Sequence, residues 1–267
     1  MLLREVEYVR PSSVDEAVRL LGANDGARAL AGGQTIVNVM KARAAAPDVL
    51  VDLNRLDDLK RIAVAGDTLE LGAMTTYTQL MASSEVEVAR PVLAEVCAAI
   101  ADVQVRNRGT LGGNLCSNDP TNHLPPLMVA LGAEMVILGV DGERTVPASE
   151  FFLGVYMTAA GPGELLTKIM VPAGRRAAFE AITLGADGTC IVSAAAALDG
   201  EVRIALGCVD AVPVLVTPAS ADEAAVREAV QGAGLDPPSD VHASGDYRRH
   251  LAEVVAVRAV RKASERS

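Results

Sequence analysis

The sequence predicts an α+β fold, because helix and strand patterns alternate early in the chain and hairpin patterns dominate its middle. The first third alternates an amphipathic helical pattern with short β-branched runs, which indicates a small α/β unit. Two Gly/Asp pairs flanked by alternating apolar residues, at 66–67 and 141–142, indicate β-hairpins. After residues 172–176 the pattern changes to three strands followed by helices. A length of 267 residues is enough for about two domains.

The N-terminal third is expected to begin with a helix over residues 12–23. Ser13 and Glu16 have the spacing of a capping box, and the apolar residues that follow recur on one helical face. The segment ARALAGG, residues 27–33, predicts a short strand that runs into a glycine pair. A helix over 35–43 and a strand over 49–53 complete this unit.

The middle of the chain is predicted to hold two hairpins, two helices and a closing strand. We expect the hairpins over 62–76 and 135–147, the helices over 92–101 and 124–133, and the strand over 164–172. The C-terminal part is expected to contain strands over 177–184, 189–198 and 201–209, a helix over 220–234 with a Ser220/Glu223 capping box, and a terminal helix over 246–263.

Composition excludes several classes of function. The formal net charge is -10 and Lys and Arg are scattered, which argues against nucleic acid or an anionic membrane surface as partner. No apolar run is long enough to span a bilayer, and the N-terminus lacks the apolar core of a signal peptide. We therefore expect a cytoplasmic protein.

The cysteines and histidines show no metal-binding spacing. Cys97, Cys116, Cys190 and Cys208 form no CxxC pair, so we interpret them as reduced core residues. The histidines lack a zinc motif such as HExxH. No iron–sulfur cluster or other metal ligand set is predicted within this chain.

Two similar glycine pairs are the strongest functional signal. One lies in LAGGQTI, residues 30–36, and the other in RNRGTLGGN, residues 106–114. Glycine lets backbone N–H groups approach a phosphate closely, and a helix that starts just after the loop adds further free N–H groups. Neither segment is a Walker A or a Rossmann GxGxxG motif. A single pair is more often a plain turn, but two pairs in matching contexts predict two loops that hold one dinucleotide by its diphosphate.

These segments also resemble a known family. AGGQTIVNVMKARAAAPDVLVDL and RNRGTLGGNLCSNDPTNHLPPLMVALGA are similar to the FAD-binding subunits of the molybdenum hydroxylases, a family that includes carbon monoxide dehydrogenase and xanthine dehydrogenase. FFLGVYMTAAGPGELLTKIMVP and YRRHLAEVVAVRAVRKA resemble later segments of that family, so the likeness covers almost the whole chain.

The resemblance implies a vanillyl-alcohol oxidase (PCMH-type) fold, in which two α/β subdomains hold FAD between them. The expected domains are an FAD-binding domain over 1–173, divided at about residue 57 into 1–57 and 58–173, and a C-terminal domain of three strands and helices over 174–267. The resemblance further implies that FAD contacts the two glycine segments and the stretch after the second segment. These residues are Ala31, Gly32, Gly33, Gln34, Thr35, Ile36, Thr110, Leu111, Gly112, Gly113, Asn114, Ser117, Asp119 and His123.

The chain offers no recognisable catalytic acid, base or nucleophile, and none is predicted. An electron-relay flavoprotein needs none, because the cofactor carries the redox chemistry. The resemblance implies a complex in which a large molybdopterin subunit oxidises the substrate, a small [2Fe-2S] subunit passes electrons on, and FAD delivers them to an external acceptor. Two alternatives stay open: a stand-alone FAD-dependent oxidoreductase, and a nucleotide-binding assembly module without redox activity.

The sequence departs from the family at three positions near the expected flavin. Many relatives carry Asp where His123 stands, Lys near Ala181 and Arg near Leu184. Fewer charges near the ring would change its redox balance, although these positions could equally drift without consequence. We hypothesise that the chain binds FAD but that NADH reduces this FAD poorly.

Overall fold

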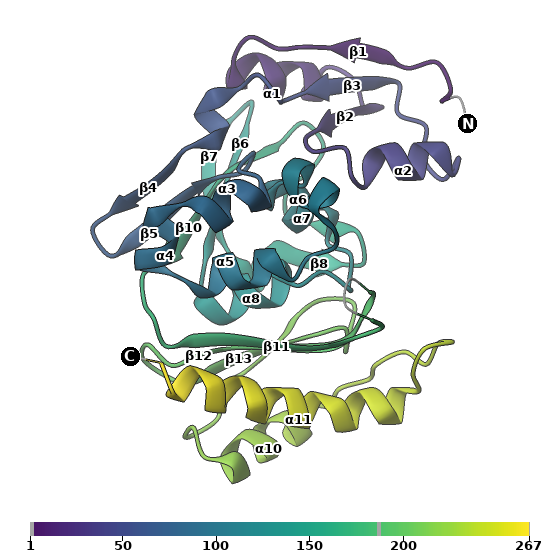
Figure 1. Ribbon diagram of the computed structural model, residues 1–267. Helices are drawn as coiled ribbons and strands as arrows, with labels where there is room; N and C mark the ends of the chain where they lie inside the picture. The colour runs from purple at the N-terminus through teal and green to yellow at the C-terminus, as the bar shows by residue number, and fades with distance from the viewer. Residues whose placement is uncertain (1–2, 186–187, 267) are drawn as a thin grey trace.

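The computed structural model describes residues 3–185 and 188–266, whose three larger β-sheets are stacked along the long dimension of the molecule (Figure 1). The N-terminal sheet lies at one end and the C-terminal sheet near the other, with α10 and α11 on its outer side. A large middle sheet and its helices lie between them. The prediction of a mixed helix-and-strand protein is confirmed.

The N-terminal sheet is a small parallel βαβαβ unit with the last strand in the centre. Its order is β1-β3-β2, and both outer strands run parallel to β3. The elements are β1 (Glu7–Val9), α1 (Val14–Gly22), β2 (Ala27–Leu30), α2 (Ile36–Lys41) and β3 (Val49–Asp52). Ser13 caps α1 as predicted, but Glu16 bonds to Ser12 instead of closing a box on Ser13. The first strand was not predicted.

The middle sheet is antiparallel, in the order β4-β5-β10-β6-β7. Both predicted hairpins are confirmed, and the strand from the end of this segment lies between them. The strands are β4 (Ile62–Ala65), β5 (Thr68–Gly72), β6 (Glu134–Gly139), β7 (Gly142–Pro147) and β10 (Leu165–Pro172), preceded by the short 3-10 helix η1 (Asp57–Lys60). A separate two-stranded hairpin pairs β8 (Phe152–Gly154) with β9 (Met157–Thr158).

The helices of this part pack around the middle sheet. They are α3 (Tyr77–Ala82), α4 (Ser84–Ala89), α5 (Val92–Ala98), α6 (Val103–Arg108), α7 (Leu111–Ser117), α8 (Leu124–Leu131) and α9 (Ala148–Phe151). Of these, α5 and α8 also contact the C-terminal sheet. Every residue of α8 is buried, and its side chains share one core with both sheets. Only α5 and α8 were predicted in this group.

The C-terminal sheet has four antiparallel strands, so the prediction of three was wrong. They are β11 (Ala177–Thr183), β12 (Cys190–Ala197), β13 (Arg203–Gly207) and β14 (Val214–Val216), with α10 (Glu223–Gly232) and α11 (Gly245–Ser264) covering one face. The last strand is three residues long and lies between Pro213 and Pro218, which mask its pattern. Asp222, and not Ser220, occupies the N-cap of α10.

A buried ion pair links the middle and C-terminal parts at the predicted boundary. Arg90 is 2 % exposed and donates to the carboxylate of Asp199 at 2.5 Å and to the carbonyl of Pro172. Asp199 also accepts from the backbone N–H groups of Arg175 and Arg176. One guanidinium therefore fixes the end of the middle sheet to the turn between β12 and β13.

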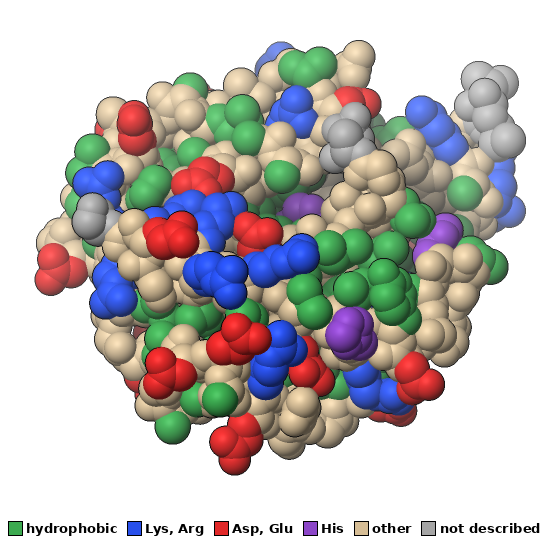
Figure 2. Space-filling model, turned by 60° about the horizontal axis from the view of Figure 1, so that its bottom comes forward, with side chains coloured by type: hydrophobic (Ala, Val, Ile, Leu, Met, Phe, Trp, Pro, Cys, Tyr) green, Lys and Arg blue, Asp and Glu red, His purple; other side chains and the backbone are tan. Residues whose placement is uncertain are grey.

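The surface around α10 and α11 carries charges of both signs in a mixed distribution (Figure 2). Lys and Arg side chains there alternate with Asp and Glu, and no basic stripe crosses this face. No helix among the described residues combines the length and the apolar character needed to cross a membrane.

Candidate functional site

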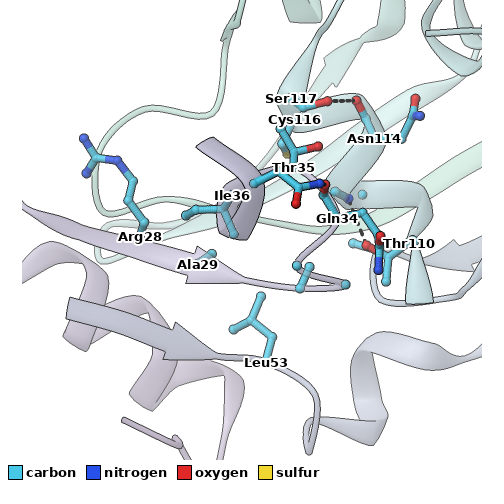
Figure 3. A pocket seen from close by; sticks show the side chains of 18 of the residues that line it. Arg28, Ala29, Gln34, Thr35, Ile36, Leu53, Thr110, Asn114, Cys116 and Ser117 are labelled. Atoms are coloured by element: carbon cyan, nitrogen blue, oxygen red, sulfur yellow. Dashed lines mark hydrogen bonds between the residues drawn. The ribbon is translucent and has the colours of Figure 1, made fainter. Parts of the chain in front are cut away.

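A cavity of about 850 Å³ separates the N-terminal unit from the middle of the molecule. One wall consists of β2, the loop after it and α2, and the facing wall is α7 (Figure 3). Gln34, Thr35, Thr110, Asn114 and Ser117 converge on the same hollow. The volume lies in the upper part of the range for pockets that hold cofactors and drug-sized ligands.

The loop after β2 offers free backbone donors to the cavity. Gly33 has a positive φ of 74°, a conformation that favours glycine. Within the described parts of the chain, no protein group accepts from the N–H groups of Gly33, Gln34 and Thr35. Successive unpaired N–H groups of this kind form an anion-binding concavity.

Gly32 serves a different purpose from Gly33. A Cβ added to Gly32 would lie 2.0 Å from the carbonyl oxygen of Arg108. The absence of a side chain therefore lets the loop touch the junction between α6 and α7.

The second glycine pair lies inside the first turn of α7, which corrects the prediction of a loop. Thr110 is the N-cap and accepts from the N–H of Gly113 at 3.1 Å and, through its carbonyl, from the N–H of Asn114 at 3.0 Å. The N–H groups of Leu111 and Gly112 donate to the carbonyls of Thr75 and Ala73. All four first-turn donors thus have protein partners, and the expectation that both glycine pairs supply free N–H groups was wrong.

Close packing explains the glycines of α7. A Cβ on Gly112 would lie 2.6 Å from the Cβ of Ala73, so glycine lets the helix rest on the chain that leaves β5. A Cβ on Gly113 would lie 2.7 Å from the hydroxyl of Thr110 and 3.7 Å from the Cβ of Ala31 on the opposite wall. Gly113 is therefore the α7 glycine whose side chain would enter the space between the walls.

Polar side chains of α7 and of the segment after it complete the site. The Oδ1 atom of Asn114 is buried and has no hydrogen-bond partner among the described residues. The carbonyl of Asn114 accepts from the Ser117 hydroxyl at 2.8 Å and from the Asn122 amide at 3.1 Å. A buried acceptor without a hydrogen-bond donor destabilises the protein, so the Asn114 Oδ1 atom is suited to a ligand group that donates a hydrogen bond. If the Asn114 amide is rotated by 180°, its NH2 group can instead donate to a ligand acceptor.

A hydrogen-bond network behind the β2 wall of the cavity holds the glycine loop after β2 in place. The Asn54 amide donates to the Ala31 carbonyl at 3.0 Å and to the Asp52 carboxylate at 2.6 Å. Burial opposes ionisation of Asp52, but hydrogen bonds from Tyr8 and Asn54 outweigh it and lower the pKa of this carboxyl. The ionised Asp52 thus orients Asn54, which in turn fixes the start of the glycine loop.

Eleven of the fourteen residues predicted to contact the cofactor line this cavity, namely Ala31, Gly32, Gly33, Gln34, Thr35, Ile36, Thr110, Gly112, Gly113, Asn114 and Ser117. Leu111, Asp119 and His123 lie elsewhere. Leu111 points into the hydrophobic core, because the first turn of α7 directs it away from the cavity. Asp119 holds a turn by bonding to Thr121. His123 packs on the Phe179 ring, with 5.1 Å between ring centroids.

Several wall residues were not identified from the sequence. They come from distant segments and are chiefly apolar or small, including Arg28, Asn38, Val39, Leu53, Ala73, Met74, Ile100, Val105, Cys116, Asn122, Leu165 and Leu166. Tyr77, for which the sequence leaves open core packing or a flavin contact, also lines the cavity. The apolar ones follow the same patterns as core residues, so only the fold reveals them. Arg28, a charged residue in a short strand, was the one signal in the sequence that could have been noticed.

The arrangement fits an extended dinucleotide. Free N–H groups and the positive φ at Gly33 suit a diphosphate, and the apolar wall suits ring systems. Among the described residues, no group of three or more His, Cys, Asp or Glu side chains is placed to hold a metal ion.

Comparison with known proteins gives a consistent result. A family model described as "FAD binding domain in molybdopterin dehydrogenase" matches residues 4–174. The chain is 36 % identical over 290 aligned positions to the carbon monoxide dehydrogenase medium chain of Afipia carboxidovorans, covering 100 % of this chain and 99 % of that one.

Solved structures show the same likeness over the full length. A chain of the reconstituted CO dehydrogenase from Oligotropha carboxidovorans superimposes with a TM-score of 0.94 at 34 % identity, covering 100 % of both chains. A chain of quinoline 2-oxidoreductase from Pseudomonas putida 86 superimposes with a TM-score of 0.91 at 33 % identity, covering 99 % of each.

Proposed function

The chain belongs to the family of FAD-binding domains of molybdopterin dehydrogenases, and from this premise we propose that it is the FAD subunit of a molybdenum hydroxylase. In this role the chain would hold FAD as the relay between the iron–sulfur clusters and an external acceptor. The observation that carries the proposal is the 850 Å³ cavity at the glycine loop, in a chain that matches such subunits from end to end.

The FAD diphosphate is proposed to lie on the N–H groups of Gly33, Gln34 and Thr35. The Asn114 side chain faces the same space from α7, where its Oδ1 atom lacks a protein partner. The other cavity-lining residues from the two glycine segments and Ser117 complete the proposed contacts. Leu111, Asp119 and His123 are not among them.

The protein residues bind and orient the cofactor, and FAD, once bound, supplies the two-electron redox chemistry. The apolar wall excludes water from the ring systems, which favours binding of an aromatic ligand. Burial raises the pKa of Tyr77, so its phenol stays neutral at the wall of the cavity.

Partner subunits are part of the proposal. A small [2Fe-2S] subunit and a large molybdopterin subunit are proposed as partners, because the chain matches medium chains of multi-subunit dehydrogenases and hydroxylases over its full length. The substrate would be chosen on the large subunit. The four free cysteines agree with a reducing, cytoplasmic location.

The domain division is proposed on the same basis. An FAD-binding domain of the PCMH type would span 1–173, with subdomains of about 1–57 and 58–173, and a C-terminal domain would span 174–267. The separate sheets and the family match ending at residue 174 support these limits.

Isolation of the protein from its native host tests the function. We expect a yellow complex in which flavin copurifies with iron and molybdenum, and acid precipitation should release the flavin because it is bound non-covalently. Flavin without metals would support a stand-alone oxidoreductase instead, and absence of flavin would support an assembly module.

A further inference from the structure

The open edge of the N-terminal sheet borders the cavity. The strand order is β1-β3-β2, so β2 has a neighbouring strand on one side only. Arg28 and Ala29 of β2 line the cavity (Figure 3). A strand at the edge of a sheet carries backbone N–H and C=O groups that no neighbouring strand binds. The backbone groups on this edge of β2 are therefore candidates for ligand contacts.

The pairing of β2 with β3 determines which residues of β2 face the open edge. The Leu53 N–H donates to the Leu30 carbonyl at 3.0 Å, so the backbone groups of Leu30 face β3. In a parallel pair, every second residue of a strand bonds to the neighbouring strand, and the N–H and C=O of one residue lie on the same side. Hence Arg28 also faces β3, whereas Ala29 directs its N–H and C=O to the open edge.

Protein groups occupy most of the edge positions on either side of Ala29. The Ala27 N–H donates to the Asn24 carbonyl at 2.9 Å, and the Ala27 carbonyl accepts from the guanidinium of the next residue at 2.6 Å. The Ala31 carbonyl accepts from the Asn54 amide at 3.0 Å. Within the described parts of the chain, no group bonds to the N–H or the C=O of Ala29 on this edge. Because backbone groups that are removed from water are almost always paired, this edge position is suited to a ligand.

The two free groups of Ala29 match the edge of a heteroaromatic ring. They point in the same direction, so they bind a group that presents a hydrogen-bond acceptor next to a donor. The pyrimidine edge of flavin, with N3–H between two carbonyls, has this pattern, and so does adenine, with its amino group beside ring nitrogens. A peptide strand needs a longer row of free backbone groups, which the occupied positions beside Ala29 do not provide.

The distance along the chain suits a ring of the same cofactor. Ala29 precedes Gly33, the first of the N–H groups proposed to hold the diphosphate, by four residues. Four residues of extended chain span no more than about 14 Å. In FAD a ribityl chain joins the diphosphate to the flavin and a ribose joins it to adenine, so either ring can reach β2 while the diphosphate lies on the loop.

We propose that the open edge of β2 binds the hydrogen-bonding edge of one ring of the cofactor through the N–H and C=O of Ala29. The inference rests on the proposed function, because it requires that the cavity holds FAD. The flavin pyrimidine and adenine offer the same donor–acceptor chemistry, and methylated forms of FAD distinguish between them.

Proline at position 29 tests the contact. Ala29→Pro removes the N–H from the open edge and leaves the bonds between β2 and β3 in place, since proline is tolerated on an edge strand where its nitrogen faces away from the neighbour. We expect the FAD Kd to rise at least about fivefold, the effect of about one lost hydrogen bond. Flavin fluorescence titration of the full-length chain measures this Kd.

Val64→Pro is the matched control on a different edge strand. The Gly72 N–H donates to the Arg61 carbonyl, so by the same alternation Val64 directs its N–H to the outer edge of β4. The residues of β4 do not line the cavity, and Val64 is 47 % exposed. Val64→Pro should bind FAD as the unmodified chain does, and denaturant unfolding shows that each variant is folded.

Two methylated cofactors identify the ring and need no variant. FAD methylated at N3 of the flavin lacks the pyrimidine N–H, and FAD dimethylated on the 6-amino group lacks the N–H groups of adenine. We expect the unmodified chain to bind one of them at least about fivefold more weakly than FAD and the other as tightly as FAD. Weak binding of the flavin analogue assigns the pyrimidine to Ala29, and weak binding of the adenine analogue assigns adenine.

Two outcomes overturn the proposal. One is a folded Ala29→Pro chain that binds FAD as tightly as the unmodified chain. The other is an unmodified chain that binds both methylated cofactors as tightly as FAD. An unmodified chain that does not bind FAD at all would instead refute the proposed function.

Discussion

Substituting valine at Gly113 tests whether the space between the glycine loop and α7 holds the cofactor. The added Cβ would lie 2.7 Å from the Thr110 hydroxyl, closer than real Cβ contacts allow, and 3.7 Å from Ala31 across the cavity. The Thr110 hydroxyl must move, and its capping bond to the Gly113 N–H is weakened. Loss of an N-cap destabilises a protein by about 1 kcal/mol. Valine is no worse than glycine in a helix, so propensity adds no further cost.

Gly113→Val should weaken FAD binding much more than it lowers the free energy of unfolding. The branched side chain stands between the two walls, so we expect the FAD Kd to rise at least about 100-fold, equivalent to about 2.7 kcal/mol. Flavin fluorescence titration measures the Kd, and denaturant unfolding measures stability. Gly232→Val is the matched control, because this exposed helical glycine has nothing within 4 Å of an added Cβ. Normal FAD binding by Gly113→Val would show that the cofactor lies elsewhere.

Three further predictions concern the pocket, the domain contact and the acceptor. Asn114→Ala removes a buried Oδ1 atom that lacks a protein partner, so titration should show that the FAD Kd is raised about fivefold. The unfolding free energy of the FAD-free protein should stay the same or rise, and a destabilised FAD-free protein would contradict this. Arg90→Ala leaves the Pro172 carbonyl and the Asp199 carboxylate without the guanidinium that they bind, so denaturant unfolding should show that the free energy of unfolding falls by about 3–5 kcal/mol. A fall below about 1 kcal/mol would mean that the Arg90–Asp199 pair contributes little to stability. Anaerobic mixing with NADH tests the hypothesis, drawn from the sequence, that the flavin bleaches slowly. His123 does not line the cavity, so this position gives the hypothesis no structural support, and rapid and complete bleaching would refute it.

Local patterns predicted the elements that depend on local interactions. The helix that begins after Ser13 and the two hairpins at residues 66–67 and 141–142 follow from capping, turn chemistry and alternation. All of these signals lie within a few residues of the element that they specify. That is why the helix start and the two turns could be predicted, although the first hairpin ends at Gly72 and not at residue 76.

Elements fixed by distant contacts could not be predicted in the same way. Gly112 and Gly113 have the composition of a loop, yet the chain is helical there because Ala73 and Thr75 accept from its first-turn N–H groups. The sequence shows two glycine pairs but not which donors remain free. For the same reason the sequence could not decide whether Tyr77 packs in the core or faces the cofactor, since the packing of α3 against α5 and α6 is what places Tyr77 at the cavity.

Residue-resolved hydrogen exchange with and without FAD tests the central claim most directly. The N–H groups of Gly33, Gln34 and Thr35 have no protein acceptor, whereas those of residues 111–114 are already bonded within the protein. The account predicts that saturating FAD slows exchange most at residues 33–35 and changes residues 111–114 little. Unchanged exchange at residues 33–35 in a chain saturated with FAD would contradict it.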